Sequence, residues 1–94
     1  MEMPVVNACQ VESCVYNRDR ACHALAITVG DARLAMCDTF FTAPTEGGDP
    51  DVTGKVGACK MAACRHNSRF ECQAPGIEVG PNHEAAECLT FAPA

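Results

Sequence analysis

The apolar residues of the chain fall into short runs with a period of two. In the run from His23 to Val29, alternate residues would share one face of a strand and the residues between them the other face. The matching run in the second half of the chain keeps Ile77 and Val79 on its apolar face. Pro75 lacks the N–H that a ladder hydrogen bond needs, so we predict that this strand lies at a sheet edge.

A tight turn precedes the first of these strands. Seven residues separate Cys14 from Cys22, and they include Asn17 and Asp19. Asn tolerates a left-handed backbone, and Asn together with Asp initiates turns. The segment predicts a β-hairpin around a three-residue turn. Cys14 and Cys22 would then lie directly opposite each other, with Cβ atoms about 4.5–5.5 Å apart.

Each strand run ends at a glycine, and a polar and alanine-rich segment follows it. We predict one helical turn there, over 31–36 in the first half, with an aspartate as its cap, and over 82–87 in the second. A short closing strand should follow each turn. The closing strands are expected over 38–41 and 89–91. Their phenylalanines, Phe40 and Phe91, are the predicted main packed side chains.

The chain is an internal duplication, which is the strongest pattern in the sequence. The cysteine spacing is C-x4-C-x7-C-x14-C in the first copy and C-x4-C-x7-C-x15-C in the second. The one-residue difference falls after Gly30, where a loop would tolerate it. A stretch rich in Pro, Gly and acidic residues separates the copies. We therefore divide the chain into a module at 5–42, a linker at 43–55 and a module at 56–92.

The composition leaves little material for a hydrophobic core. Leu, Ile, Val and Phe supply 17 of the 94 residues, and there is no Trp. A chain this small usually needs a disulfide, a metal or another staple to stay folded. The composition argues against a large ligand pocket and a sizeable enzyme scaffold. The eight cysteines are the obvious staples.

Charge and the N-terminal sequence narrow the partners and the compartment. The net charge is −5 and the seven basic residues are scattered, so we expect no nucleic-acid partner and no membrane partner. The N-terminal residues lack the charged and apolar regions of a signal peptide. We therefore expect a cytoplasmic protein, whose thiols stay reduced.

Four cysteines per copy match the ligand count of a structural zinc site. Metal binding would also explain how so poor a core folds. The predicted ligands are Cys9, Cys14, Cys22 and Cys37 in the first site and Cys59, Cys64, Cys72 and Cys88 in the second. Two alternatives remain: disulfides, whose pairing the sequence cannot choose, and iron–sulfur binding, although the seven-residue gap breaks the plant-type spacing.

The histidines are not shared between the copies, so we expect them on the surface or partly packed. His23 corresponds to Gln73, His66 corresponds to Tyr16, and His83 falls where the spacing slips. No Cys-x-x-Cys redox motif is present. A catalytic zinc would keep an open position beside three protein ligands, whereas each copy offers four. We therefore expect no enzymatic activity.

The residues around the cysteines resemble a small bacterial family catalogued as domain of unknown function 1540. The first copy carries the resemblance at Cys14-Val15-Tyr16-Asn17, Cys22-His23-Ala24, Ile27-Thr28-Val29 and Cys37-Asp38-Thr39-Phe40. The second copy departs from it at Arg65-His66 and at Leu89 but keeps its cysteines. The resemblance implies short, often tandem modules that bind metal through these cysteines, and it implies no activity.

The sequence as a whole predicts a small metal-stapled β-rich protein with two tandem four-cysteine modules and two Zn²⁺ ions per chain. We expect a structural zinc protein that acts as an adaptor or interaction module for an unknown protein partner, as a monomer or weak homodimer. Zinc storage or sensing and a disulfide-stapled, non-enzymatic protein are the alternatives. We expect the modules to bind metal separately. Otherwise Phe40, Phe41 and Phe91 would pack across a shared interface and make one fold of two halves.

Overall fold

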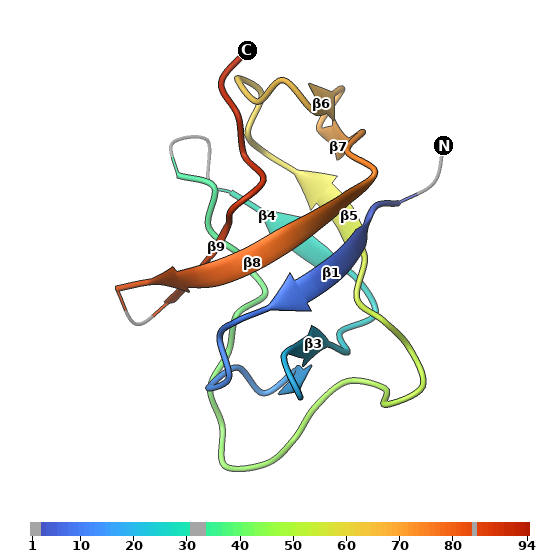
Figure 1. Ribbon diagram of the computed structural model, residues 1–94, viewed down its shortest axis with the longest axis vertical. Coiled ribbons are helices and arrows are strands. Elements are labelled where there is room, and N and C mark those ends of the chain that lie inside the picture. Colours follow the sequence, from blue (N-terminus) through green and yellow to red (C-terminus); the bar gives the residue numbers. More distant parts are fainter. Residues whose placement is uncertain (1–2, 31–33, 84) are drawn as a thin grey trace.

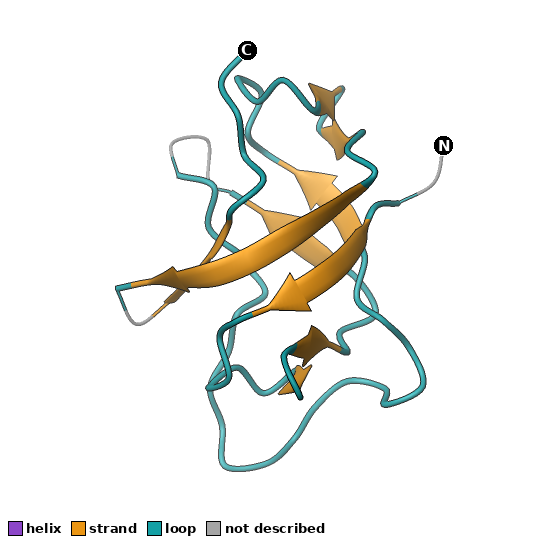
Figure 2. Cartoon of the chain, viewed as in Figure 1, coloured by secondary structure: helices purple, strands orange, loops and turns teal. Residues whose placement is uncertain are grey.

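The computed structural model describes residues 3–30, 34–83 and 85–94. This part of the chain contains nine short strands joined by loops, and no helix (Figures 1 and 2). In chain order they are β1 (Val5–Cys9), β2 (Asn17–Arg18), β3 (Ala21–Cys22), β4 (Ile27–Val29), β5 (Val56–Cys59), β6 (Asn67–Ser68), β7 (Glu71–Cys72), β8 (Gly76–Asn82) and β9 (Ala85–Cys88). The β-rich class expected from the period-two pattern is confirmed. No described segment is a helix long and apolar enough to cross a membrane.

The two copies exchange strands. β1 of the first copy pairs in parallel with β8 of the second, and β5 of the second copy pairs in parallel with β4 of the first. Figure 1 shows the two pairs, β1 beside β8 and β4 beside β5. β1 and β5 occupy equivalent places in the duplication, as do β4 and β8. The fold is therefore a pseudo-symmetric pair of interlocked halves.

The edge position predicted from Pro75 is wrong. β8 is the middle strand of a three-stranded sheet, with β1 on one side and β9 on the other. Pro75 lies directly before Gly76, where the strand begins, so its missing N–H removes no bond from the ladder.

Both predicted hairpins form, but with a shorter turn than expected. Asp19 and Arg20 have φ of 53° and 64°, which are the two left-handed residues of a type I′ turn. This two-residue turn pairs Cys22 with Asn17, so the expected pairing of Cys22 with Cys14 is wrong. The second copy repeats the turn at Arg69 and Phe70, and Cys72 pairs with Asn67.

One asparagine per copy holds each hairpin in place. The Asn17 amide donates to the Cys9 carbonyl at 2.7 Å, and its oxygen accepts from the Arg20 N–H at 3.2 Å. Asn67 repeats both bonds, to the Cys59 carbonyl at 2.9 Å and from the Phe70 N–H at 3.1 Å. The asparagine shared by the copies thus ties the turn to the first cysteine of its own copy.

The strand expected from His23 to Val29 is interrupted. It is regular over Ile27–Val29, and Leu25 is 67% exposed instead of lying on the apolar face. The His23 N–H still donates to the Tyr16 carbonyl across the hairpin, but the His23 carbonyl accepts from the Asp49 N–H of the linker. The chain therefore leaves the ladder after β3 and returns to it at β4.

The helical turn expected over 82–87 is also wrong. β8 and β9 continue their antiparallel pairing from Val79 opposite Cys88 to Asn82 opposite Ala85. This ladder uses the backbone groups that a helical turn would need. In the first copy part of the expected turn, 31–33, lies outside the described residues. Met36, at the end of the expected turn, forms an isolated bridge with Glu87.

The closing strand begins and ends earlier than predicted. β9 ends at Cys88, and Leu89 and Thr90 form a turn in place of a strand. The Leu89 N–H donates to the Glu78 carbonyl, and the Thr90 hydroxyl accepts from the Glu78 N–H at 3.0 Å. In the first copy Thr39 accepts from the Thr28 N–H at 3.1 Å. These threonines fold the chain back over its own copy.

The core is a single cluster to which both copies contribute. Its most deeply buried large side chains are Val6, Val56 and Ile77, which lie on the exchanged strands. Phe40 and Phe91 are partly buried and pack against this cluster, whereas Phe41 is 58% exposed. The shared core therefore follows the alternative of one fold in two halves, with aliphatic residues rather than phenylalanines at its centre.

Candidate metal centres

The four cysteines of each copy line one cavity. Cys9, Cys14, Cys22 and Cys37 line the first, and Cys59, Cys64, Cys72 and Cys88 line the second. Each cavity has a volume of about 20 Å³. That volume is comparable to the space for one water molecule. It is large enough for a single ion and excludes an organic cofactor.

Each cysteine is delivered by a different short element. In the second copy Cys59 ends β5, Cys72 ends β7 and Cys88 ends β9, whereas Cys64 lies in the loop between β5 and β6. The Cys59 N–H donates to the Phe70 carbonyl at 2.9 Å, which fastens β5 to the hairpin turn. The first copy repeats this bond from Cys9 to Arg20 at 2.9 Å. Sequence-distant thiols are thus brought to one cavity by hairpin and strand contacts.

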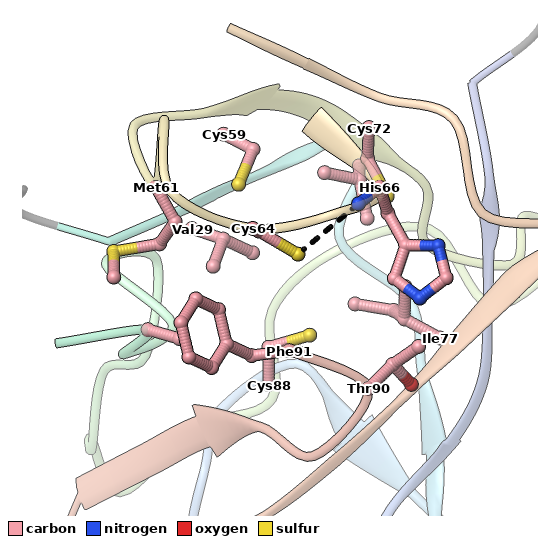
Figure 3. Close-up of a pocket in the computed structure, with 12 residues that line it drawn as sticks. Val29, Cys59, Met61, Cys64, His66, Cys72, Ile77, Cys88, Thr90 and Phe91 are labelled. Atoms are coloured by element: carbon pink, nitrogen blue, oxygen red, sulfur yellow. Dashed lines mark hydrogen bonds between the residues drawn. The ribbon is translucent and has the colours of Figure 1, made fainter. Parts of the chain in front are cut away.

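The second cavity is drawn in Figure 3. The sulfur atoms of Cys59, Cys64 and Cys88 point into the space between them, with Met61 and Phe91 on one side and His66 on the other. The His66 backbone N–H donates to the Cys64 sulfur at 3.5 Å.

The three histidines are exposed or partly buried, as expected, but one of them lines a cysteine cavity. His23 is half-buried and bonds the Val52 carbonyl through Nδ1 at 2.8 Å, and His83 is exposed. His66 is half-buried and lines the second cavity, where Tyr16 lines the first. Sequence reasoning missed that position 66 faces the thiols. The sequence does show that His66 and Tyr16 are equivalent, because each follows the second cysteine of its copy by two residues. This close spacing to a cysteine is the signal that could have placed both near the thiols.

Burial dominates the pKa of two thiols in each copy. It raises the pKa of Cys37 to about 11, although the Thr39 N–H that bonds the sulfur offsets part of the rise. Burial likewise raises the pKa of Cys22, Cys72 and Cys88, with smaller contributions from the neighbouring thiols of the same copy. Without a cation these groups are neutral thiols at pH 7. A cation among them would stabilise the thiolate form instead.

Backbone N–H groups approach the sulfurs in the same way in both copies. Ala24 donates to Cys22, and Ala74 donates to Cys72. Thr39 and Phe40 donate to Cys37, as Thr90 and Phe91 donate to Cys88. Donors of this kind stabilise negative charge on sulfur. These bonds offset part of the effect of burial in both cavities, and no charged side chain of the described residues is buried near them.

Four thiols per cavity are the right donor types for a tetrahedral metal site. Their side chains are not yet arranged as a metal site in this structure. Within residues 3–30, 34–83 and 85–94, no three or more His, Cys, Asp or Glu side chains are grouped so that they could hold a metal ion. All eight cysteines lie in these ranges and are free thiols. A cysteine reorients by rotation about one bond among staggered wells. Convergence of four sulfurs on one point would come from that rotation.

The cavities also contain residues that the sequence could not assign to them. Val79 and Ala86 of the second copy line the first cavity, and Val29 and Ala35 of the first copy line the second. In the duplication Val29 corresponds to Val79 and Ala35 to Ala86. Internal repetition identifies equivalent positions, but it does not tell which copy's residue reaches which cavity.

Comparison with known proteins gives one family. The sequence model described as Domain of Unknown Function (DUF1540) matches residues 8–44 and 58–91, which fall on the two copies and include all eight cysteines. No curated protein and no solved structure matches the chain. The two matched segments cover most of the sequence, and the chain belongs to the DUF1540 family, of which it carries two tandem modules.

Proposed function

We propose that the protein binds two Zn²⁺ ions, one in each cysteine cavity, and that the ions stabilise its fold. The observation that carries this proposal is that four thiols of each copy line a cavity of about 20 Å³. The first ion would be held by Cys9, Cys14, Cys22 and Cys37, and the second by Cys59, Cys64, Cys72 and Cys88. Zinc supplies no redox chemistry and favours four such ligands at about 2.3 Å.

The role that fits this arrangement best is a non-enzymatic adaptor or interaction module in the cytoplasm. Four protein ligands leave no open position for a substrate. Leu25, Phe41 and Phe70 are 67%, 58% and 59% exposed, so large apolar side chains are available on the surface for contact with another protein. Phe70 also lies in a left-handed turn position, which is uncommon for a bulky residue. The net charge of −5 disfavours nucleic acid as the partner.

Zinc storage or sensing is the second candidate. It is favoured by the partial exposure of one or two thiols in each set: Cys14 and Cys37 in the first copy and Cys88 in the second are half-buried, whereas the other five are buried. An accessible thiolate gives a competing ligand a place to attack. The two roles differ in how firmly the metal is held.

Native mass spectrometry of the intact chain, purified under reducing conditions, tests the proposal. We expect two zinc ions per chain and the mass of eight free thiols after acid denaturation. A mass lower by eight hydrogens and without metal would establish four disulfides instead. Circular dichroism before and after addition of a strong chelator then separates the roles. Loss of the fold with the metal supports a structural role, and a fold that persists without metal supports storage.

A further inference from the structure

The two cysteine cavities are joined through two buried valines. Val79 of β8 pairs with Cys9 on one side and with Cys88 on the other. Val29 of β4 pairs with Cys59 and bridges to Cys37. Each valine is 2% exposed. Each valine therefore lies between a cysteine of the first cavity and a cysteine of the second.

Reciprocal backbone bonds reinforce the connection. The Cys37 N–H donates to the Ala86 carbonyl at 2.8 Å, and the Cys88 N–H donates to the Ala35 carbonyl at 2.7 Å. The last cysteine of each copy is thus held by the segment that leads to the last cysteine of the other copy. Two further bonds follow the same symmetry, from the Gln10 N–H to the Val79 carbonyl at 2.9 Å and from the Lys60 N–H to the Val29 carbonyl at 2.7 Å.

The physical consequence is that ordering one cavity also orders part of the other. An ion in the first cavity would fix Cys9 and Cys37, and with them the backbone of Val79 and Val29. Those valines are the strand partners of Cys88 and Cys59, so the second cavity would then have less conformational entropy to lose when its own ion binds. Most of the conformational entropy of the shared core is therefore lost when the first ion binds, and little more is lost with the second.

We propose that the two metal sites are positively coupled, so that an ion in one raises the affinity of the other and the chain loads its two ions together. This inference rests on the proposed zinc function and concerns its regulation. Couplings between sites in proteins typically amount to roughly 5- to 150-fold in affinity. Electrostatic repulsion between two anionic thiolate sites would act in the opposite direction. The sign of the coupling therefore reports which effect dominates.

The test is a titration of the full reduced chain with one equivalent of Zn²⁺, read by native mass spectrometry. When binding is tight, two independent sites leave at least half of the chains with a single ion, whether or not their affinities are equal. We expect the one-ion species to lie well below half, with metal-free and two-ion chains in excess. A one-ion population of half or more, together with single-site variants that bind as tightly as the intact chain, would overturn the coupling. A chain that binds two ions in this way still satisfies the proposed function, whereas a chain that binds none refutes both.

A matched pair of variants provides a second measurement. Cys59→Ser/Cys64→Ser leaves the first site intact, and Cys9→Ser/Cys14→Ser leaves the second. Linkage requires that loss of either site weaken the other by the same factor. Competition with a chromophoric chelator measures the affinity of the remaining site in each variant. We expect equal losses of roughly 5-fold or more relative to the intact chain. Remaining sites that bind as tightly as the intact chain would overturn the inference.

Discussion

The asparagine that anchors each hairpin offers a direct test of the fold. In Asn17→Ala the Cys9 carbonyl loses the amide donor at 2.7 Å, and the Arg20 N–H loses its acceptor at 3.2 Å. Each such bond contributes about 1 kcal/mol net, and the partly buried carbonyl left without its partner adds to the loss. We expect a destabilisation of about 2 kcal/mol. For a domain of this size that corresponds to a fall in melting temperature of roughly 8–16 °C.

The measurement is thermal unfolding of the purified protein, followed by circular dichroism. Asn67→Ala should give a similar fall, because it loses the same two bonds in the second copy. Asn17→Asp keeps the acceptor and loses the donor, so its fall should be smaller. Asn7→Ala is the control, since this exposed side chain lies on β1 away from the turn. A melting temperature of Asn17→Ala equal to that of the wild type would refute the anchoring role.

Two further predictions concern the cavities. A Cβ at Gly54 would lie 2.5 Å from the Cys22 sulfur, so Gly54→Ala should displace this thiol, reduce the zinc content and destabilise the fold by about 1–3 kcal/mol. Gly57→Ala, whose Cβ would meet Ala26 at 3.2 Å, is the milder control, and equal zinc content and melting in both variants would contradict the prediction. Burial raises the pKa of Cys22, Cys72 and Cys88, and that of Cys37 to about 11, so zinc must displace protons from these thiols at pH 7 and its affinity should rise with pH. Calorimetry in buffers of different ionisation enthalpy should count at least two protons released per ion, and no release would show that thiolates exist before the metal arrives.

The composition of each thiol cluster could be predicted from the sequence. Three cysteines of each copy recur at an offset of fifty and the fourth at fifty-one, so the sequence predicts two equivalent groups of four, and each group lines one cavity. The period-two pattern also placed Ile27, Val29, Ile77 and Val79 correctly in the core. These features depend on local spacing and on the alternation of side chains along a strand, which the chain encodes directly.

The partners of the strands could not be predicted in this way. Alternation tells which face of a strand is buried, but it does not say which strand lies beside it. The parallel pairing of β1 with β8 therefore has no local signal. The error over 82–87 has a different cause. Ala85, Ala86 and Glu87 have good helix propensity, but pairing with β8 overrides so weak a preference.

Strand exchange has a consequence for synthesis of the protein on the ribosome. β1 is made early, yet its partner β8 begins about 70 residues later, a delay of roughly 3–14 s at ordinary elongation rates. During this interval β1 lacks its parallel strand partner, although it can already contact the β2–β3 hairpin, and the four cysteines of the first copy cannot be enclosed by Val79 and Ala86. Synthesis must therefore reach β9 before either thiol cluster can close. Until then the thiols of the first copy lack the cover that Val79 and Ala86 give them in the folded chain.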